Sequence, residues 1–313
     1  MSVKRLFLFA AYDKEGIIDD TLLHYLRCLS DYGDVAFVMD NFAEKSELNK
    51  LKEIPNILYY SAERHGEYDF GSYKRCYQWA NKKRLLNKYD WVYLVNDSVY
   101  GPLFDIRSVL EDLESRGVDL TGMIDFTNKF TPRQVQSWFV GLSRKVADSE
   151  FIKNFMNSVS AQTDKQLIVL KYEVGLSQEV LRHGYKMSTY ISGEKGEPQH
   201  RVYDEPLEML KLGLPFIKKQ GLVNLHGMQY LYPYTTEVFV DQIYRNAVRT
   251  GISLVPLAVT QFEKPKYEKW YRLTLWGIPL LTIYRQRHDT GGVTCYRAYL
   301  LDYVPLIKVF RRK

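Results

Sequence analysis

The sequence predicts an α/β fold in which a mostly parallel, Rossmann-type sheet carries helices on both faces. Short apolar runs alternate with helical patterns between residues 4 and 124, which is the order that strand–helix–strand crossovers produce. The run at 91–95 is the most strand-like in the chain, and the run at 4–11 has the continuous apolar character of a buried strand. Beyond residue 262 the chain is rich in Tyr, Trp, Leu and Arg, which predicts a helical, basic and aromatic C-terminal extension.

Each element of the predicted sheet has its own signal. The first helix begins at Asp19 or Asp20, which are both suitable N-cap residues, and it ends at Gly33. Leu22 and Leu26 lie on its apolar face. The predicted strands are 4–11, 35–39, 57–60, 91–95, 120–124, 135–142 and 187–191. The predicted helices are 19–33, 43–52, 72–86, 106–115, 149–158 and 176–183, and a polar loop follows at 192–206.

Composition and charge divide the chain into two parts. The 313 residues are 46% hydrophobic and 26% charged, which excludes disordered, collagen-like and disulfide-stapled classes. The net charge of +6 is uneven, because residues 263–313 hold 11 Lys and Arg against 4 Asp and Glu, whereas residues 1–262 hold 32 against 33. We therefore predict a domain at 1–262 and a basic extension at 263–313. Such an extension predicts an anionic partner, either a membrane surface or a nucleic acid.

The cysteines and the apolar segments indicate a cytoplasmic protein. Cys28, Cys76 and Cys295 are far apart and lack the spacing of a disulfide framework or a zinc cluster, and a reducing compartment fits them best. The apolar segment at 275–283 is much shorter than the roughly 20 residues of a spanning helix. The chain start runs into charged residues without a cleavage site, so we expect a first strand there and not a signal peptide.

The first candidate site is Asn96-Asp97-Ser98, directly after the strand predicted at 91–95. Ligands of open α/β sheets bind beyond the carboxyl ends of the strands. An aspartate with flanking amide and hydroxyl oxygens can hold a hard divalent cation, which in turn binds a diphosphate. The same residue types, followed by Gly101-Pro102, are equally typical of a turn that ends a strand.

A second candidate is Asp69-Phe70-Gly71-Ser72-Tyr73-Lys74, which leads into the helix predicted at 72–86. Gly71 would allow a backbone to approach closely, the free N–H groups of a helix start can meet a phosphate, and Lys74 adds a positive charge. A helix cap followed by an ordinary surface lysine is the alternative.

Three further segments carry candidate side chains. Glu173 stands just ahead of the helix predicted at 176–183, where its carboxylate can accept a proton or simply complement the helix N-terminus. Lys218 could neutralise a leaving diphosphate, or belong to a solvated basic pair. The amide, hydroxyl and ring of Gln136, Ser137 and Trp138 could meet a sugar, or lie in an apolar strand.

Taken together, these motifs resemble a known family, the rhamnan synthesis protein F family of bacterial cell-surface polysaccharide glycosyltransferases. The resemblance covers roughly residues 3–225 and rests on five segments in a fixed order. These are DFGSYK at 69–74, LVNDSVYGPL at 94–103, QSWF at 136–139, YEVGLS at 172–177 and PFIK at 215–218. It implies a nucleotide-sugar transferase fold of the GT-A type and work on rhamnan, O-antigen or capsule glycans.

The resemblance also implies roles for single residues. In the wider fold, a short acidic motif after a central strand binds a metal, Mn²⁺ or Mg²⁺, and the donor diphosphate. Asn96-Asp97-Ser98 is similar in position but has one carboxylate where that motif has two. Inverting members carry a Glu-Asp pair before a helix; here Glu173 is followed by Val174. The resemblance therefore implies Glu173 as the catalytic base and Asp97 as a metal ligand.

We therefore expect an inverting transfer of a sugar from a nucleotide donor to the hydroxyl of a glycan acceptor. The expected donor site consists of Tyr12, Asp69, Gly71, Lys74, Asn96, Asp97, Ser98 and Lys218, and the expected acceptor site of Gln136, Ser137 and Trp138. The expected partners are dTDP-rhamnose or a UDP-sugar, a lipid-linked or polymeric glycan acceptor, and the inner leaflet of the membrane at the basic extension. A nucleic acid is not expected, because the chain lacks a reading motif.

Two alternatives stay open. The first is the same fold with another donor, such as a UDP-hexose or a galactofuranosyl nucleotide. The second is a non-catalytic sugar-binding or scaffolding relative, which the reduced acidic motif at Asp97 keeps in consideration.

Overall fold

The structure is a computed structural model. It describes residues 3–127, 131–162, 164–192, 201–252 and 254, and the backbone of four strands between residues 269 and 312. The chain forms two compact units, Met1–Pro256 and Leu257–Lys313. The unit boundary lies a few residues before the division predicted at 262/263.

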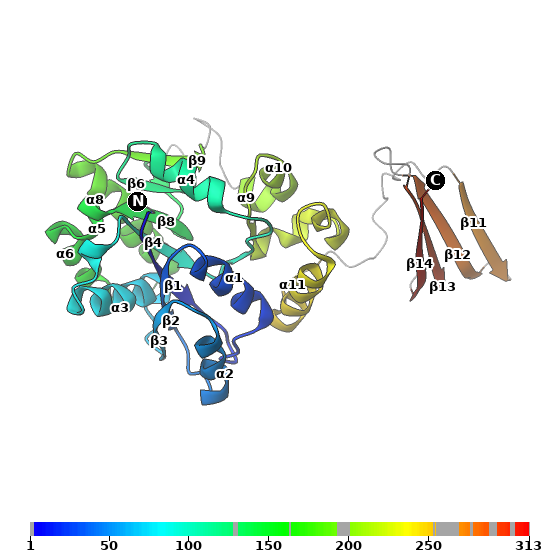
Figure 1. The fold of residues 1–313 in the computed structure, drawn as a ribbon, viewed down its shortest axis with the longest axis horizontal. Coiled ribbons are helices and arrows are strands. Elements are labelled where there is room, and N and C mark those ends of the chain that lie inside the picture. Colours follow the sequence, from blue (N-terminus) through cyan, green and yellow to red (C-terminus); the bar gives the residue numbers. More distant parts are fainter. Residues whose placement is uncertain are drawn as a thin grey trace. The chain divides into compact units, whose positions relative to one another are not determined.

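The first unit is built around one mixed sheet (Figure 1). Its strands run in the order β3-β2-β1-β4-β8-β6-β7, with β9 also paired to β6. Their bounds are β1 (Arg5–Ala11), β2 (Asp34–Met39), β3 (Ile57–Ala62), β4 (Trp91–Asn96), β6 (Leu120–Phe126), β7 (Gln134–Val135), β8 (Phe139–Ser143) and β9 (Met187–Ile191).

Four pairings in this sheet are parallel: β1 with β2, β1 with β4, β2 with β3 and β6 with β9. The β8 strand runs antiparallel to both β4 and β6, and β7 runs antiparallel to β6. The predicted α/β fold with a mostly parallel sheet is therefore confirmed, with an antiparallel insertion at β8. In the β1–β4 ladder Ala10 lies opposite Asn96, so the segments that follow the two strands emerge side by side.

Helices cover both faces of the sheet because successive residues of β1 and β4 are apolar on both sides. Phe7 and Phe9 belong to one hydrophobic core, whereas Leu6 and Leu8 belong to the other. The first core includes residues of α1 (Asp20–Ser30) and α4 (Arg107–Ser115). The second includes residues of α3 (Tyr68–Lys82), α5 (Arg144–Ala147), α6 (Glu150–Ser158) and α8 (Gly175–Arg182). α2 (Lys45–Asn49) and the 3₁₀ turn η1 (Lys50–Glu53) precede β3, and the 3₁₀ turn η2 (Leu86–Lys88) follows α3.

A third core joins the segment after β4 to the end of the unit. It contains Tyr100 and Leu103 together with apolar side chains of α11 (Glu237–Thr250). The two-stranded sheet of β5 (Val99–Tyr100) and β10 (Ile217–Lys218) lies at its edge. The remaining elements of this part are α9 (Arg201–Asp204), α10 (Pro206–Lys211), η4 (Lys219–Leu225) and η5 (Met228–Leu231).

Three predicted boundaries in the first unit are wrong. α3 begins at Tyr68 instead of residue 72. The strand predicted at 135–142 is two strands, β7 and β8, separated by a turn at 136–138. The helix predicted at 176–183 starts much earlier, because α7 (Lys165–Ile168) leads through a π-helical turn, η3 (Val169–Val174), directly into α8.

The prediction of a helical C-terminal extension is also wrong. The second unit is an antiparallel sheet of β11 (Lys269–Leu275), β12 (Ile278–Arg287), β13 (Val293–Leu300) and β14 (Val304–Arg312). Aromatic and β-branched residues are frequent in these segments, and such residues favour strands. Among the residues with a described conformation, no helix is both long and apolar enough to cross a bilayer.

Candidate functional site

The candidate site begins where β1 and β4 end. Strand order diverges there, since β1 continues to β2 on one side while β4 lies on its other side, and ligands of open α/β sheets bind at such a point. The backbone N–H of Tyr12, directly after β1, donates to Oδ2 of Asp97, directly after β4, at 3.2 Å. The Tyr12 ring itself is half exposed. The loops at the two strand ends are thus tied together through the Asp97 carboxylate.

A chain of hydrogen bonds runs from α3 across the end of β4 to β10. The amide nitrogen of the buried Asn96 donates to Oδ2 of Asp69 at 2.9 Å, and its amide oxygen accepts from the Ser98 hydroxyl at 2.5 Å. The Ser98 hydroxyl in turn accepts from Nζ of Lys218 at 2.8 Å. Four predicted donor-site residues, Asp69, Asn96, Ser98 and Lys218, therefore lie together.

Two motifs that are distant in sequence place Lys218 beside Ser98. In the β5–β10 pair Lys218 lies opposite Val99, and the backbone N–H of Leu103 donates to the carbonyl of Pro215 at 2.8 Å. Gly101 has φ 141° and allows this approach, because a Cβ there would lie 2.7 Å from the Pro215 carbonyl oxygen. The Gly-Pro turn after β4 and the Pro-Phe-Ile-Lys segment thus form one structural unit.

Aromatic rings surround the Lys218 ammonium. The Lys218 residue is 8% exposed, and its Nζ lies 5.3 Å from the centre of the Trp138 ring and 5.8 Å from that of Tyr203. Both distances fit cation–π contacts. A lysine in these surroundings is a fixed positive charge at the sheet edge, suited to an anionic group such as a phosphate.

Glu173 lies on the π-helical turn η3 and not ahead of a helix, as the sequence had predicted. Its carboxylate is half-buried, and its Oε2 accepts a hydrogen bond from the Ser137 hydroxyl at 2.9 Å. Because the helix is continuous around it, complementing a helix N-terminus does not explain this residue. Single π turns within helices are frequent at functional sites.

The charge of Glu173 acts on two tyrosines, the buried Tyr73 and the partly buried Tyr203. Burial, and after it the charges of Asp69 and Glu173, raise the pKa of the Tyr73 hydroxyl well above its ordinary value. Burial and the charge of Glu173 raise the pKa of Tyr203 to about 12. Tyr203 is also one of the rings beside Lys218. The Glu173 charge and the Lys218 ammonium therefore both act on the same aromatic side chain.

Asp97 has different surroundings. Burial raises the pKa of its carboxyl, and the nearby charges of Asp13 and Asp19 raise it further, whereas Lys219 and the Tyr12 N–H lower it. Nζ of Lys219 lies 3.8 Å from its Oδ2. Across the described part of the chain, no three His, Cys, Asp or Glu side chains are grouped to hold a metal. A carboxylate beside an ammonium group, without two further ligand-type side chains grouped around it in the described residues, does not fit Mn²⁺ or Mg²⁺, so no step below is routed through a metal.

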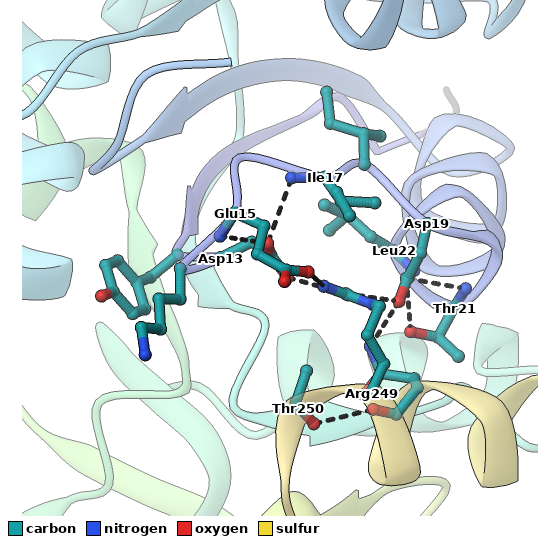
Figure 2. Close-up of polar contacts among 12 residues, drawn as sticks. Asp13, Glu15, Ile17, Asp19, Thr21, Leu22, Arg249 and Thr250 are labelled. Carbon is teal, nitrogen blue, oxygen red and sulfur yellow. Dashed lines mark hydrogen bonds and ion pairs between the residues drawn. The ribbon is translucent and has the colours of Figure 1, made fainter. Parts of the chain in front are cut away.

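An arginine from α11 balances the acidic residues near Asp97 (Figure 2). Nη2 of Arg249 lies 2.7 Å from Oδ2 of Asp13 and 3.1 Å from Oδ2 of Asp19, and its Nη1 lies 3.3 Å from Glu15. Asp19 also caps α1, as predicted, by accepting from the N–H groups of Thr21 and Leu22. One guanidinium therefore fixes the loop after β1 and the start of α1 to the end of α11.

Gly71 and Lys74 are not brought into the hydrogen-bond chain. The Lys74 ammonium pairs with Glu67 at 3.2 Å and donates to the Val159 carbonyl at 2.7 Å. A Cβ at Gly71 would lie 2.3 Å from that of Glu67 and 2.7 Å from the His65 ring. Packing inside the protein thus explains why residue 71 is a glycine. The Lys74 ammonium is used in an internal ion pair.

The motif Gln136-Ser137-Trp138 forms the turn between β7 and β8. Trp138 is 2% exposed and Gln136 7% exposed, and the indole N–H of Trp138 donates to the Gln136 side chain at 2.9 Å. These two side chains hydrogen bond to each other and are buried, whereas the Ser137 hydroxyl points to Glu173.

Sequence reasoning did not single out several residues at this edge of the sheet. Tyr73 lies inside the motif at 69–74, which was selected for its glycine and lysine. Its place in that motif was the one signal that could have pointed to it. Tyr203 falls in the segment predicted as a polar loop, and its helix α9 is only four residues long. Arg249 has no local signal, because its acidic partners lie at the other end of the unit.

Comparisons with known proteins were made for sequence and structure. No match was found among curated proteins. A crystal structure of residues 1–349 of TarS from S. aureus is 12% identical, with a TM-score of 0.35 over 84% of this chain and 77% of that one. A further TarS structure is 9% identical, with a TM-score of 0.32 over 95% of this chain and 64% of that one. The model of rhamnan synthesis protein F matches residues 35–261, well over half of the sequence, and the chain therefore belongs to that family.

Proposed function

We propose that the protein is a GT-A-like glycosyltransferase of bacterial surface polysaccharide synthesis, which moves a sugar from a nucleoside diphosphate donor to an acceptor hydroxyl with inversion. The observation that carries the proposal is the position of Glu173. It is a half-buried residue on a π-helical turn whose carboxylate is held by Ser137, and its charge acts on Tyr203, the ring that the buried Lys218 also contacts. A proton acceptor and a cation that both act on one ring suit a group transfer in its neighbourhood.

In this reaction the acceptor hydroxyl gives its proton to the Glu173 carboxylate as its oxygen forms a bond to the anomeric carbon. The bond from that carbon to the diphosphate oxygen breaks, and the nucleoside diphosphate leaves with the electron pair. Lys218 stabilises the charge that grows on the diphosphate, and it does so in a site where protein groups replace water. Asn96 and Ser98 hold Lys218 in place through their hydrogen bonds.

The donor proposed from family membership is dTDP-rhamnose, with a lipid-linked or polymeric glycan as acceptor. A UDP-hexose or a galactofuranosyl nucleotide would use the same groups. A panel of nucleotide sugars, each scored by release of nucleoside diphosphate with and without acceptor glycan, distinguishes these donors. The panel is run with Mn²⁺ and with EDTA. If no member of the panel yields nucleoside diphosphate while sugar binding persists, the chain is a non-catalytic relative.

The test of the mechanism is Glu173→Gln. The amide keeps the shape and can still accept from Ser137, but it cannot take a proton, so turnover should fall by about 10²–10⁴-fold while donor affinity stays within about twofold. The matched control is Glu179→Gln on α8, because Glu179 pairs only locally with Arg182 and His183 in the contacts described. Turnover by Glu173→Gln at the rate of the control would disprove the assignment of the base.

A further inference from the structure

The turn between β7 and β8 is fixed around Ser137 by hydrogen bonds to three other elements. The Tyr73 hydroxyl of α3 donates to the Ser137 carbonyl at 3.0 Å. The N–H of Asn96 in β4 donates to the Trp138 carbonyl at 3.2 Å, and the N–H of Gln136 donates to the Ile124 carbonyl at 3.0 Å. These contacts come from three different elements, so the turn has little freedom to shift relative to the sheet.

The helix that carries Glu173 is fixed to the same segment. The N–H of Val135, in β7, donates to the Ser177 hydroxyl at 3.1 Å, and the Gln178 amide donates to the Arg133 carbonyl at 2.9 Å. Ser177 and Gln178 follow Glu173 by about one helical turn. The serine and the carboxylate that meet at 2.9 Å thus both stand on backbone that is anchored independently of their own contact.

We infer that Ser137 is a positioning residue for Glu173 and not a contact for the acceptor sugar. Its hydroxyl donates to one carboxylate oxygen, Oε2, and so fixes the orientation of the carboxylate that is proposed to take the proton of the acceptor hydroxyl. The neighbours of Ser137 support the same role, because Gln136 and Trp138 are buried and bonded to each other. The inference rests on the proposed function, since it assigns a role to the partner of the proposed base.

The experiment compares Ser137→Ala with Ser137→Thr, using the donor that the nucleotide-sugar panel identifies. Loss of a hydrogen bond to a charged group at the reacting centre should lower kcat by about 10- to 100-fold, with the KM for the acceptor within about twofold of wild type. Ser137→Thr retains a hydroxyl and should keep kcat within about threefold. An increase in acceptor KM with unchanged kcat would overturn the inference, because that is the signature of lost substrate binding.

The matched control is Ser143→Ala. Ser143, at the end of β8, also donates to a carboxylate, Asp119, at 3.0 Å, but it lies at the opposite end of that strand from Ser137. It should leave kcat and KM unchanged. If Ser137→Ala does not fold, Ser137→Cys supplies a weaker donor of similar shape, and wild-type kcat in that variant would overturn the inference.

A double-mutant cycle separates this inference from the proposed function. In the Glu173→Gln background, Ser137→Ala should cause no further loss of turnover, because its effect is exerted through the carboxylate. Full additivity of the two losses would overturn the positioning role. If Glu173→Gln alone were fully active, the proposed function would fail; if Glu173→Gln were inactive while Ser137→Ala kept wild-type kcat, only the present inference would fail.

Discussion

The two carboxylates of the site, Asp97 and Glu173, are held in opposite ways. Asp97 lies among charges: Lys219 is 3.8 Å away, and Arg249 neutralises Asp13 and Asp19 close by. The hydrogen bond described for Glu173 comes from a neutral donor, Ser137, and the charge of Glu173 raises the pKa values of Tyr73 and Tyr203. Surroundings built from compensating charges respond to pH and to salt, whereas neutral hydrogen bonds respond much less.

The difference suggests a division of labour. The ion pairs on the Asp97 side join segments from both ends of the first unit, so we expect changes there to appear mainly as changes in stability. The contacts on the Glu173 side join a turn and a helix that are already anchored by backbone hydrogen bonds, so we expect changes there to appear mainly in turnover.

The largest effect on stability is expected for Arg249→Met. The guanidinium is 26% exposed, and its partners Asp13 and Asp19 are 9% and 20% exposed. The cost of removing the arginine should therefore lie between the costs of breaking a buried and a surface ion pair. We expect the free energy of unfolding to fall by about 2–3 kcal/mol, measured by urea denaturation. Arg245→Met is the control, because Arg245 lies on the same helix and pairs with the exposed Asp241; its cost should stay below about 1 kcal/mol. Equal losses in the two variants would show that the ion pairs of Arg249 stabilise the fold no more than an exposed pair does, and the Asp97 side would then have no special role in stability.

The acid dependence of stability should also reside on the Asp97 side. Burial alone would raise the pKa of Asp13 and Asp19, but hydrogen bonds from Arg249 and from nearby backbone N–H groups, and for Asp19 also from Asn246, lower both pKa values below the ordinary value of 3.8. Groups with a lowered folded-state pKa stabilise the fold fully above the ordinary pKa and lose that contribution as pH falls through the folded value.

This dependence can be measured by unfolding wild type and Arg249→Met in urea at pH 7, 4 and 3. Wild type should lose more stability than the variant between pH 4 and pH 3, since the variant no longer holds the two carboxyl pKa values down. A parallel decline of Arg249→Met and wild type would show that the ion pairs do not determine acid sensitivity.

The sequence predicted the part of the site that depends on strand ends. The apolar run at 91–95 fixes where β4 stops, and the segment after a strand in such a sheet must lie at its carboxyl edge. The cluster of Asn96, Ser98 and Asp69 could therefore be predicted from the sequence. The sequence could name Lys218 and Ser98 only as candidates for one site, because nothing but the order of their motifs linked them.

Contacts between distant segments could not be predicted in this way. Arg249 and Asp13 are 236 residues apart, and no periodicity links them. The π-helical turn at Glu173 has no sequence signature in this chain, so the residue was placed ahead of a helix instead of inside one. The prediction for the C-terminal unit was wrong for another reason. Its aromatic and basic residues suit either an amphipathic helix or a strand, and tertiary pairing decides between the two.

The smallest effect, and the one of opposite sign, is expected for Asp97→Asn. Burial raises the pKa of Asp97 above 3.8, so its contribution to stability is present below that ordinary value and is lost as pH rises through the folded value. At pH 7 its charge therefore destabilises the fold, and the variant should gain about 1 kcal/mol in urea denaturation. Asp90→Asn is the control: Asp90 precedes β4 as Asp97 follows it, its side chain is 40% exposed and pairs with Arg144, and its replacement should not stabilise. Destabilisation by Asp97→Asn would mean that the favourable contacts of the charged carboxylate with Lys219 and the Tyr12 N–H outweigh the cost of its burial. The charge of Asp97 would then stabilise the folded state at pH 7 instead of destabilising it.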